Sequence, residues 1–302
     1  MRYDEGVGRP GRQGDESVHN DPEHREGEAV AGLRGDGDAT IGASIVARGL
    51  TKIYGRGADA FHALGPIDLD IRPGEFVSLI GPSGCGKSTT LLLVSGLEPH
   101  SDGTVEVDGK PLREPISDVG IVFQDHLLLE FRTAMRNVMI QQEIRGLDKA
   151  TLRSRAADLF ERLELSGAEN RYPWQLSGGM RQRVSIARAL VHDPSMLLMD
   201  EPFGALDAIT RTQIRHDLEM LWLTTQKTVL FITHSIDEAV GLSDRVLVMS
   251  KSPGRIVDEI VIDLPRPRPA HLGDYPEFAG YARRIYEIFE KLGVYRFGQA
   301  GS

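Results

Sequence analysis

A glycine-rich run at residues 81–89 is the part of the sequence whose residue types and spacing most clearly predict chemistry. Its letters, GPSGCGKST, fit the pattern G-x-x-x-x-G-K-[ST], in which backbone N–H groups wrap a phosphate. The apolar run Phe76–Ile80 precedes it and an apolar helix follows it, which disfavours a chance glycine-rich turn. We expect Lys87 to reach the β- and γ-phosphates of a nucleotide and Ser88 to offer its hydroxyl to Mg²⁺.

Cys85 is the only cysteine of the chain and lies inside this run. Because a helix N-terminus lowers the pKa of a thiol, a reactive or redox-sensing side chain is one interpretation. We favour the other, a small residue that contributes its backbone N–H to the phosphate site. The predicted nucleotide contacts of the loop are Gly81, Ser83, Gly84, Cys85, Gly86, Lys87, Ser88 and Thr89.

Polar residues follow three apolar runs at the points where strands would end. Asp200 and Glu201 come after residues 196–199, and Gln124 and His234 end two further runs. An acid at such a strand end holds Mg²⁺ in related nucleotide hydrolases, which suits Asp200, and Glu201 is placed to polarise an attacking water. A solvated turn, or a structural histidine, is the alternative for each. Since open parallel sheets bind ligands at the carboxyl ends of their strands, we expect these residues to converge on the γ-phosphate.

A second anion-binding element lies at residues 176–180. Ser177, Gly178 and Gly179 stand at the start of a predicted helix over residues 181–192. A helix that starts with serine and two glycines presents backbone N–H groups to an anion. One chain therefore carries two phosphate-binding devices, which a simple kinase does not need.

Short apolar runs predict strands from residue 45 onward. Turn residues separate the early runs, which favours antiparallel pairing, whereas helical segments separate the later runs, as in parallel crossovers. Apolar residues at three-to-four spacing predict helices between residues 131 and 170. We therefore expect an α/β fold with a small β layer and an inserted helical subdomain. The expected strands are 45–50, 67–71, 76–80, 105–107, 119–123, 196–199, 229–232, 246–249 and 256–262.

The amino-acid composition and the net charge limit the classes of protein to which the chain could belong. The 302 residues are 40% hydrophobic, which is enough for one large core. Residues 1–40 hold ten acids and five arginines, a net charge of −5, so −4 of the total of −9 falls on the remainder. We interpret residues 1–42 as a disordered acidic tail, because they contain too few aliphatic side chains to offset their ordering entropy. The lack of a basic surplus argues against a nucleic-acid partner.

Neither a membrane span nor a secretory signal is predicted. The sequence has no apolar run of about 18 residues and its start lacks an apolar segment. A single cysteine fits a reducing compartment, so we expect a soluble, cytoplasmic chain.

The C-terminal part changes character after the strand-like run 256–262. Residues 265–269 alternate proline with arginine, and an amphipathic helix follows. We expect that helix to pack on the protein's own surface, because it has too few basic residues for a membrane-surface role. The predicted domains are 43–262 for nucleotide binding, with a helical subdomain at about 126–175, and 263–302 for a linker and helix. The apolar face of the helix consists of Phe278, Ala282, Ile285, Phe289 and Leu292.

Together these motifs resemble those of the ATP-binding subunits of ABC transporters from about residue 45 to 261. The resemblance implies a P-loop NTPase with a RecA-like mixed sheet core, an antiparallel β subdomain and an inserted helical subdomain, which hydrolyses ATP with Mg²⁺. The matching positions are residues 81–89 for Walker A, Gln124 for the Q-loop, 176–180 for the signature, 197–201 for Walker B, 204–207 for the D-loop and His234 for the switch histidine.

The resemblance also implies residue roles. Tyr54 falls where the family places an aromatic ring that stacks on adenine, although an ordinary strand-edge tyrosine is the alternative. Asp207, at the end of the D-loop, joins Ser177, Gly178 and Gly179 among the nucleotide contacts. The implied catalytic residues are Glu201, His234 and Gln124, and the implied magnesium ligands are Ser88, Gln124 and Asp200.

The family works as a head-to-tail pair, in which the signature of one subunit covers the ATP on the Walker motifs of the other. The implied partners are a second copy or a closely related subunit, integral membrane permeases and, indirectly, a solute-binding protein. The implied location is the cytoplasmic face of the inner membrane. The finer resemblance is to importer subunits for nitrate, sulfonates and taurine, which share Met180 and the Ser-Pro-Gly-Arg-Ile run at 252–256.

One departure from that group concerns the permease. The group usually carries Leu-Pro-Trp-x-Thr soon after the Q-loop, whereas residues 129–133 here read Leu-Glu-Phe-Arg-Thr, so we expect a different permease-facing surface. A non-transport ATPase of the same superfamily, in DNA repair, chromosome structure or translation, is the alternative function. The single cassette without a long coiled-coil insertion disfavours it, and the signature and His234 disfavour a kinase or GTPase.

Overall fold

The computed structural model describes residues 42–269 and 271–294. Of the two units into which the chain divides, only the second, Ala39–Ser302, contains described residues. The acidic tail predicted for residues 1–42 therefore lies outside the described residues, apart from Gly42, which is buried.

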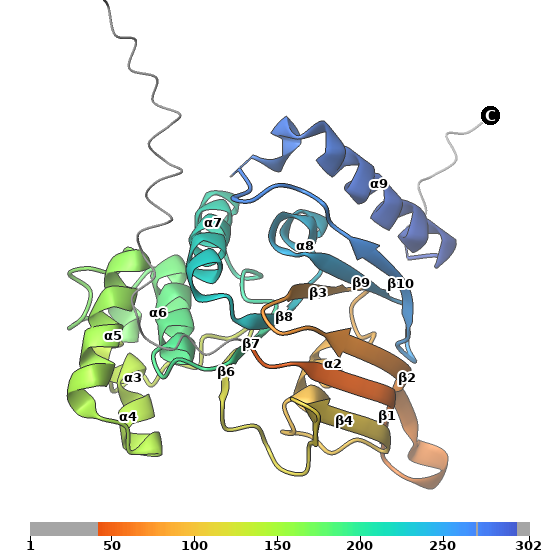
Figure 1. Cartoon of the computed structure of the whole chain (residues 1–302), viewed down its shortest axis with the longest axis horizontal. Helices are drawn as coiled ribbons and strands as arrows, with labels where there is room; N and C mark the ends of the chain where they lie inside the picture. The colour runs from red at the N-terminus through yellow and green to blue at the C-terminus, as the bar shows by residue number, and fades with distance from the viewer. Residues whose placement is uncertain (1–41, 270, 295–302) are drawn as a thin grey trace, which may run out of the picture. The chain divides into compact units, whose positions relative to one another are not determined.

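A six-stranded sheet crosses the second unit in the order β10-β9-β3-β8-β7-β6 (Figure 1). Its neighbours pair in parallel, except for β9 and β10, which pair antiparallel. Strands β3, β8 and β9 are buried along their whole length, so their largely apolar side chains are covered on both faces. The predicted mixed sheet is confirmed. Its strands are β3 (Phe76–Ile80), β6 (Val119–Val122), β7 (Met196–Asp200), β8 (Thr228–Thr233), β9 (Arg245–Met249) and β10 (Ile256–Val261).

A second, antiparallel sheet has the order β2-β1-β4-β5, and it too was predicted. Strand β1 alternates buried with more exposed residues, and its buried side packs in the same apolar cluster as part of β3. Helix α2 (Lys87–Val94) contributes Leu91, Leu93 and Val94 to this cluster. The cluster therefore fixes the start of α2 relative to both sheets. The strands are β1 (Ile45–Tyr54), β2 (Phe61–Ile71), β4 (Asp102–Val107) and β5 (Lys110–Pro111).

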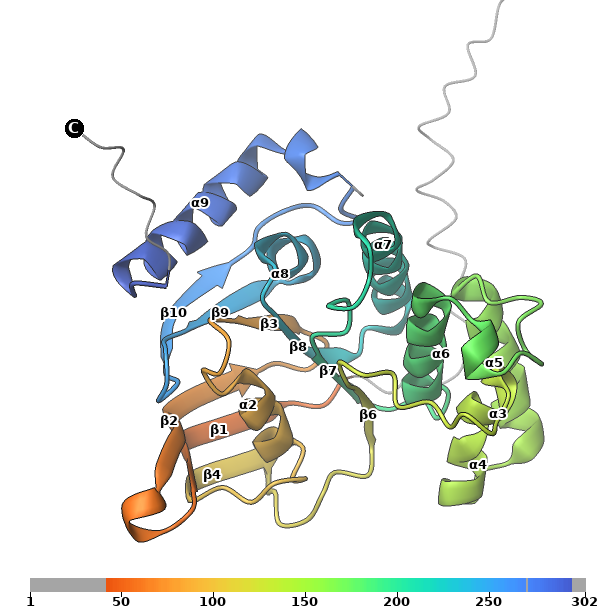
Figure 2. The same ribbon diagram turned by 180° about the vertical axis from the view of Figure 1, so that it is seen from behind.

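Helices gather beside the far edge strand β6, as predicted for the inserted segment (Figures 1 and 2). Those of the inserted segment are α3 (Ala134–Val138), α4 (Ile140–Arg145) and α5 (Lys149–Arg162). Helix α6 (Gly178–Leu190) follows the insertion and begins three residues earlier than the predicted helix over residues 181–192. Two further helices, α7 (Ala208–Thr225) and α8 (Ile236–Leu242), connect β7 to β8 and β8 to β9. Short 3₁₀ turns lie at Gly57–Asp59, Pro173–Gln175 and Leu272–Asp274.

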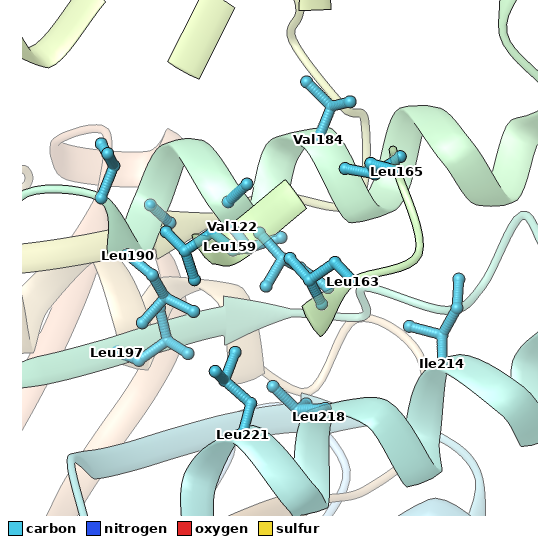
Figure 3. Close-up of a cluster of buried hydrophobic side chains, with 14 of the residues drawn as sticks. Val122, Leu159, Leu163, Leu165, Val184, Leu190, Leu197, Ile214, Leu218 and Leu221 are labelled. Carbon is cyan, nitrogen blue, oxygen red and sulfur yellow. The ribbon is translucent and has the colours of Figure 1, made fainter. Parts of the chain in front are cut away.

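A hydrophobic cluster joins these helices to the sheet (Figure 3). Fully burying one such aliphatic side chain contributes about 1.5–3 kcal/mol, so the cluster is a major source of stability. Because α6 packs against both the sheet and α5, it links the helical segment to the strands that carry the site. The labelled members are Val122, Leu159, Leu163, Leu165, Val184, Leu190, Leu197, Ile214, Leu218 and Leu221.

The C-terminal segment packs against the rest of the unit. Arg268, in the alternating proline–arginine run, is only 1% exposed and donates hydrogen bonds to the carbonyls of Val240 and Ser243. Helix α9 (Pro276–Lys291) follows and lies beside α8 (Figure 2). All five apolar residues predicted for its inner face belong to, or pack on, one cluster with α8, β9 and β10. The expectation that this helix covers the protein's own surface is confirmed.

No helix within the described ranges is long and apolar enough to cross a membrane.

Gly120 offers a test of the contact between β6 and α6. A Cβ added there would lie 2.3 Å from the Ala189 carbonyl oxygen and 3.0 Å from Leu197 Cδ1. We expect Gly120→Ala to lower the free energy of unfolding by about 1–3 kcal/mol, because neither backbone nor packed leucine can move cheaply. Urea titration monitored by circular dichroism measures this. Gly280→Ala, on α9 where nothing lies within 4 Å of the new Cβ, is the control and should be neutral or stabilise by up to about 1 kcal/mol. Equal effects of Gly120→Ala and Gly280→Ala on the free energy of unfolding would contradict the close contact between β6 and α6.

Candidate functional site

The loop between β3 and α2 has the backbone of an anion-binding element. Gly84 and Gly86 adopt left-handed φ values of 73° and 99°, which residues with a side chain rarely tolerate. The first helical hydrogen bond of α2 runs from the Thr90 N–H to the Gly86 carbonyl at 2.8 Å. The N–H groups of Lys87, Ser88 and Thr89 therefore precede the intrahelical bonds and face the loop at the positive end of the helix dipole.

Lys87 places a buried positive charge at this loop. Its side chain is 5% exposed, and Nζ donates to the carbonyl oxygens of Gly81 at 2.9 Å and Pro82 at 3.2 Å. The same Nζ lies 3.7 Å from Glu201 Oε1, at the end of β7. The loop thus carries a cation that already faces an acid from a neighbouring strand.

Ser88 and Asp200 meet as the magnesium prediction requires. The Ser88 hydroxyl donates to Asp200 Oδ1 at 3.0 Å. Burial raises the pKa of Asp200, and the hydrogen bond from Ser88 and the charge of Lys87 act in the opposite direction. Among the described residues, no three histidine, cysteine or acidic side chains gather around a possible metal site. One hydroxyl and one carboxylate suit Mg²⁺, which keeps several waters and binds through substrate phosphates.

Gln124 lies at the end of β6, near the segment that follows Glu201. A Cβ added at Gly204 would be 3.7 Å from Gln124 Nε2, so the amide group lies beside that segment. The described residues show no direct hydrogen bond from Gln124 to Ser88 or Asp200.

Glu201 and His234 are in direct contact. His234 Nδ1 lies 2.9 Å from Glu201 Oε2, while the other carboxylate oxygen faces Lys87. Glu201 has a φ of 44°, a left-handed value that costs a residue with a side chain on the order of 1 kcal/mol, and its N–H donates to the Ile232 carbonyl at 2.9 Å. Such strain, held in place by the neighbouring strand, is typical of functional residues.

The second anion-binding element caps α6. Ser177 Oγ accepts from the Met180 N–H at 3.2 Å, and a Cβ added at Gly179 would lie 2.5 Å from Thr210 Cγ2. Asp207 caps α7 in the same way, and hydrogen bonds from Thr210 lower its pKa. Figures 1 and 2 both show α6 well apart from α2, so one chain does not bring these residues to its own phosphate loop.

Tyr54 ends β1 and is 37% exposed. The ammonium of Lys52 lies 4.8 Å from the centre of its ring, and Phe61, which is 54% exposed, is its partner across the β1–β2 hairpin. The sequence analysis did not single out Phe61. The signal that could have found it is the pairing of β1 with β2 in a hairpin, which places Phe61 opposite Tyr54. The pair forms an exposed aromatic end to the antiparallel sheet.

The Cys85 side chain is buried and its pKa is raised, whereas a reactive thiol is accessible and has a lowered pKa. It is 1% exposed, and burial raises its pKa more than the nearby charge of Lys87 lowers it. Its sulfur faces inward, since a Cβ added at Gly81 would lie 2.9 Å from Sγ. The redox-sensing interpretation is therefore not supported.

The parallel sheet, the phosphate loop and the acids at the end of β7 define the class of P-loop nucleotide hydrolases. The profile of the ABC transporter family matches residues 64–204. The chain is 44% identical over 241 residues to an ABC transporter ATP-binding protein of Methanocaldococcus jannaschii, covering 80% of this chain and 89% of the relative. It is also 39% identical to the aliphatic sulfonates import ATP-binding protein of Bacillus licheniformis, covering 83% of this chain and 96% of the relative.

Similar solved structures agree with the sequence comparison. The dimeric structure of a bacterial ABC transporter cassette has a TM-score of 0.65 at 34% identity, and it covers 73% of this chain and 100% of its own. A taurine import ATP-binding protein of Rhizobium johnstonii is 44% identical, covering 78% of this chain and 90% of the relative. This chain belongs to the ABC transporter family of ATP-binding proteins, and the predicted ATPase class is thereby confirmed.

Burial of Cys85 predicts slow alkylation. At pH 8 we expect iodoacetamide to modify it about a hundredfold more slowly, or slower still, in the native protein than in guanidinium, because access requires opening and the raised pKa reduces the thiolate. Mass spectrometry of timed samples measures the rate. Ser166→Cys in a Cys85→Ser background is the control, since residue 166 is exposed and should react at an ordinary rate. Equal native rates at the two positions would contradict the burial.

Proposed function

We propose that this chain energises the import of a small solute, by binding and hydrolysing ATP between two copies of itself. The observation that carries the proposal is the contact of Glu201, which follows β7, with Lys87 at the start of α2 and with His234 after β8. The solute class is inferred from the relatives, whose names assign them to aliphatic sulfonates and taurine. We therefore propose a small anionic, organosulfur or nitrogen-containing solute.

The proposed nucleotide site uses the phosphate loop as its base. Backbone N–H groups of the loop bind the phosphates, the Lys87 ammonium pairs with them, and the adenine stacks on Tyr54. Ser88 and Asp200, with Gln124 nearby, would hold Mg²⁺, which neutralises phosphate charge. The full set proposed to contact the nucleotide is Tyr54, Gly81, Ser83, Gly84, Cys85, Gly86, Lys87, Ser88, Thr89, Ser177, Gly178, Gly179 and Asp207.

Glu201 is the proposed general base. Its carboxylate accepts a proton from the attacking water while the water oxygen bonds to the γ-phosphorus and the bond to ADP breaks. The His234 contact orients the carboxylate, and Lys87 balances its charge in the ground state. When the γ-phosphate binds, the Lys87 ammonium pairs with it in place of Glu201. Gln124 transmits the presence of the phosphate to the helical segment.

A second copy completes the proposed site. Ser177, Gly178 and Gly179 cap a helix that is remote from the chain's own phosphate loop, so they are free to bind the partner's nucleotide. The similar cassette structure is itself a dimer, and a second one is described as a post-hydrolysis state with ADP and Pi. Hydrolysis would then control the opening of the pair.

The proposed permease contact lies on the helical segment. Phe131 is 73% exposed, Ile144 70% and Leu127 57%, and all three follow Gln124 in the chain. Large exposed apolar side chains of this kind mark interaction surfaces. The chain would thus be peripheral, bound at the cytoplasmic face of the membrane through its permease, with a solute-binding protein acting from the other side. The names of the relatives do not favour a non-transport role.

Replacing Glu201 tests the proposed base. Glu201→Gln should lower kcat by about a hundredfold to ten-thousandfold, because general base catalysis contributes that much, while ATP still binds. Phosphate release and fluorescent ATP binding measure the two effects. Glu259→Gln, the same change on β10, is the control and should hydrolyse normally. A Glu201→Gln enzyme with the parent rate would remove Glu201 from this role.

Replacing Ser177 tests the shared site. Ser177→Asp keeps the α6 cap but adds a negative charge where the partner's phosphate would lie. We expect ATPase activity to fall about tenfold or more, because a like charge at about 4 Å costs on the order of 1–4 kcal/mol.

The neutral variant Ser177→Asn keeps the same cap and should retain more activity. ATP affinity of the monomer, from fluorescence titration, and ATP-dependent dimerisation, from light scattering, separate the two steps. Normal dimerisation and hydrolysis by Ser177→Asp would refute the shared site.

A further inference from the structure

Glu238 lies close to the site but plays no part in the chemistry described so far. It occupies the first turn of α8, four residues beyond His234 in the chain, and is only 5% exposed. Burial raises the pKa of its carboxyl, while its hydrogen bond and the charges of Arg211 and His234 act in the opposite direction. A buried acid requires partners, and its two oxygens face two different parts of the fold.

One oxygen of Glu238 fixes the backbone on both sides of His234. Thr233 Oγ1 donates to Glu238 Oε2 at 2.5 Å, and the same Oγ1 accepts from the Ser235 N–H at 3.0 Å. Ser235 in turn caps α8 by accepting from the Glu238 N–H at 3.3 Å. In an ordinary capping box the acid would reach the cap residue's N–H directly. Here the Thr233 hydroxyl lies between the Glu238 carboxylate and the Ser235 N–H. Thr233 and Ser235, on either side of His234, are therefore both linked to one carboxylate.

The other oxygen faces the segment that precedes α7. Arg211 Nε lies 3.6 Å from Glu238 Oε1, and Arg211 Nη2 donates to the Leu206 carbonyl at 2.9 Å. Leu206 immediately precedes Asp207, which caps α7. Glu238 therefore has contacts in two directions, one toward His234 and one toward residues 204–207.

We propose that Glu238 is a positioning residue, which couples the orientation of His234 to the position of residues 204–207 through Arg211. The proposal rests on the function assigned above to Glu201 and His234. In that function Asp207 contacts the nucleotide, and the Arg211–Glu238 pair transmits the position of residues 204–207 to the His234–Glu201 contact. Glu238 acts through Thr233 and Arg211 rather than on the nucleotide, so its effect falls on turnover rather than on ATP binding.

The first test compares two buried acids. Glu238→Gln keeps the shape of the side chain and an oxygen for the Thr233 hydroxyl, but removes the charge that faces Arg211. We expect kcat to fall about tenfold to a hundredfold, since a displacement of about 1 Å at a reacting group costs about a hundredfold. The KM for ATP and the affinity for a non-hydrolysable ATP analogue should stay within about twofold. Glu219→Gln is the matched control, because Glu219 is 1% exposed and binds Arg266 and the Arg268 N–H away from the site.

The second test measures coupling, which a merely structural role would not produce. Arg211 and Thr233 contact different oxygens of Glu238, so Arg211→Met and Thr233→Val should affect kcat non-additively. In a Glu238→Gln background the coupling should disappear. This double-mutant cycle also tests the positioning role if Glu238→Gln proves unstable, because Arg211→Met and Thr233→Val each leave the Glu238 carboxylate in place.

The outcomes separate this proposal from the function on which it rests. A Glu238→Gln enzyme with parental kcat, a loss equal to that of Glu219→Gln, or additive effects of Arg211→Met and Thr233→Val would overturn the positioning role. If Glu201→Gln is inactive in the same assay, the hydrolytic site stands even then. If Glu201→Gln hydrolyses at the parental rate, the site assignment itself fails.

Discussion

Parallel pairing of β8 between β3 and β7 is the constraint on which the site depends. Its register places Ile80 opposite Thr233 and Asp200 opposite Ile232, so the three strands end almost level. Their next residues then face the same edge of the sheet, where open α/β sheets bind ligands. An acid and a histidine from distant parts of the sequence thereby meet at this edge, and the loop that follows β3 brings Lys87 to the acid. A slip of one residue in either pairing would turn these side chains to the opposite face.

The Glu201 backbone shows how closely that edge is specified. A left-handed conformation is unfavourable for glutamate, yet a hydrogen bond from its N–H to the Ile232 carbonyl holds it there. The carboxylate then has a cation on one side and an imidazole on the other. The carbonyl that accepts from the strained backbone belongs to β8, and the histidine that contacts the carboxylate follows the same strand. The free energy that stabilises the parallel strand pairing also maintains a backbone geometry at Glu201 that the isolated residue would not adopt.

The sequence was sufficient to predict those features that depend on local order. Each strand end with a polar residue was predictable, because an apolar run followed by Gln124, Asp200 or His234 is visible in the letters. Side-chain partners across the fold were not. The contact of Lys87 with Glu201, the roles of Arg211 and Glu238, and the burial of Arg268 depend on helix packing that no periodicity encodes. Cys85 illustrates the same limit, because a helix N-terminus alone predicts a lowered pKa and burial reverses its direction.

Helix α8 is held at both ends, which bears on how the site responds to its partner. At its start, Ser235, Thr233 and Glu238 form one hydrogen-bonded unit. At its end, Arg268 donates to the carbonyls of Val240 and Ser243, as a cation does favourably at a helix C-terminus. With seven residues, a helix fastened in this way has little freedom to bend. In the proposed coupling, a displacement that reaches Glu238 would therefore move α8 as a whole, against the packing of α9 on it.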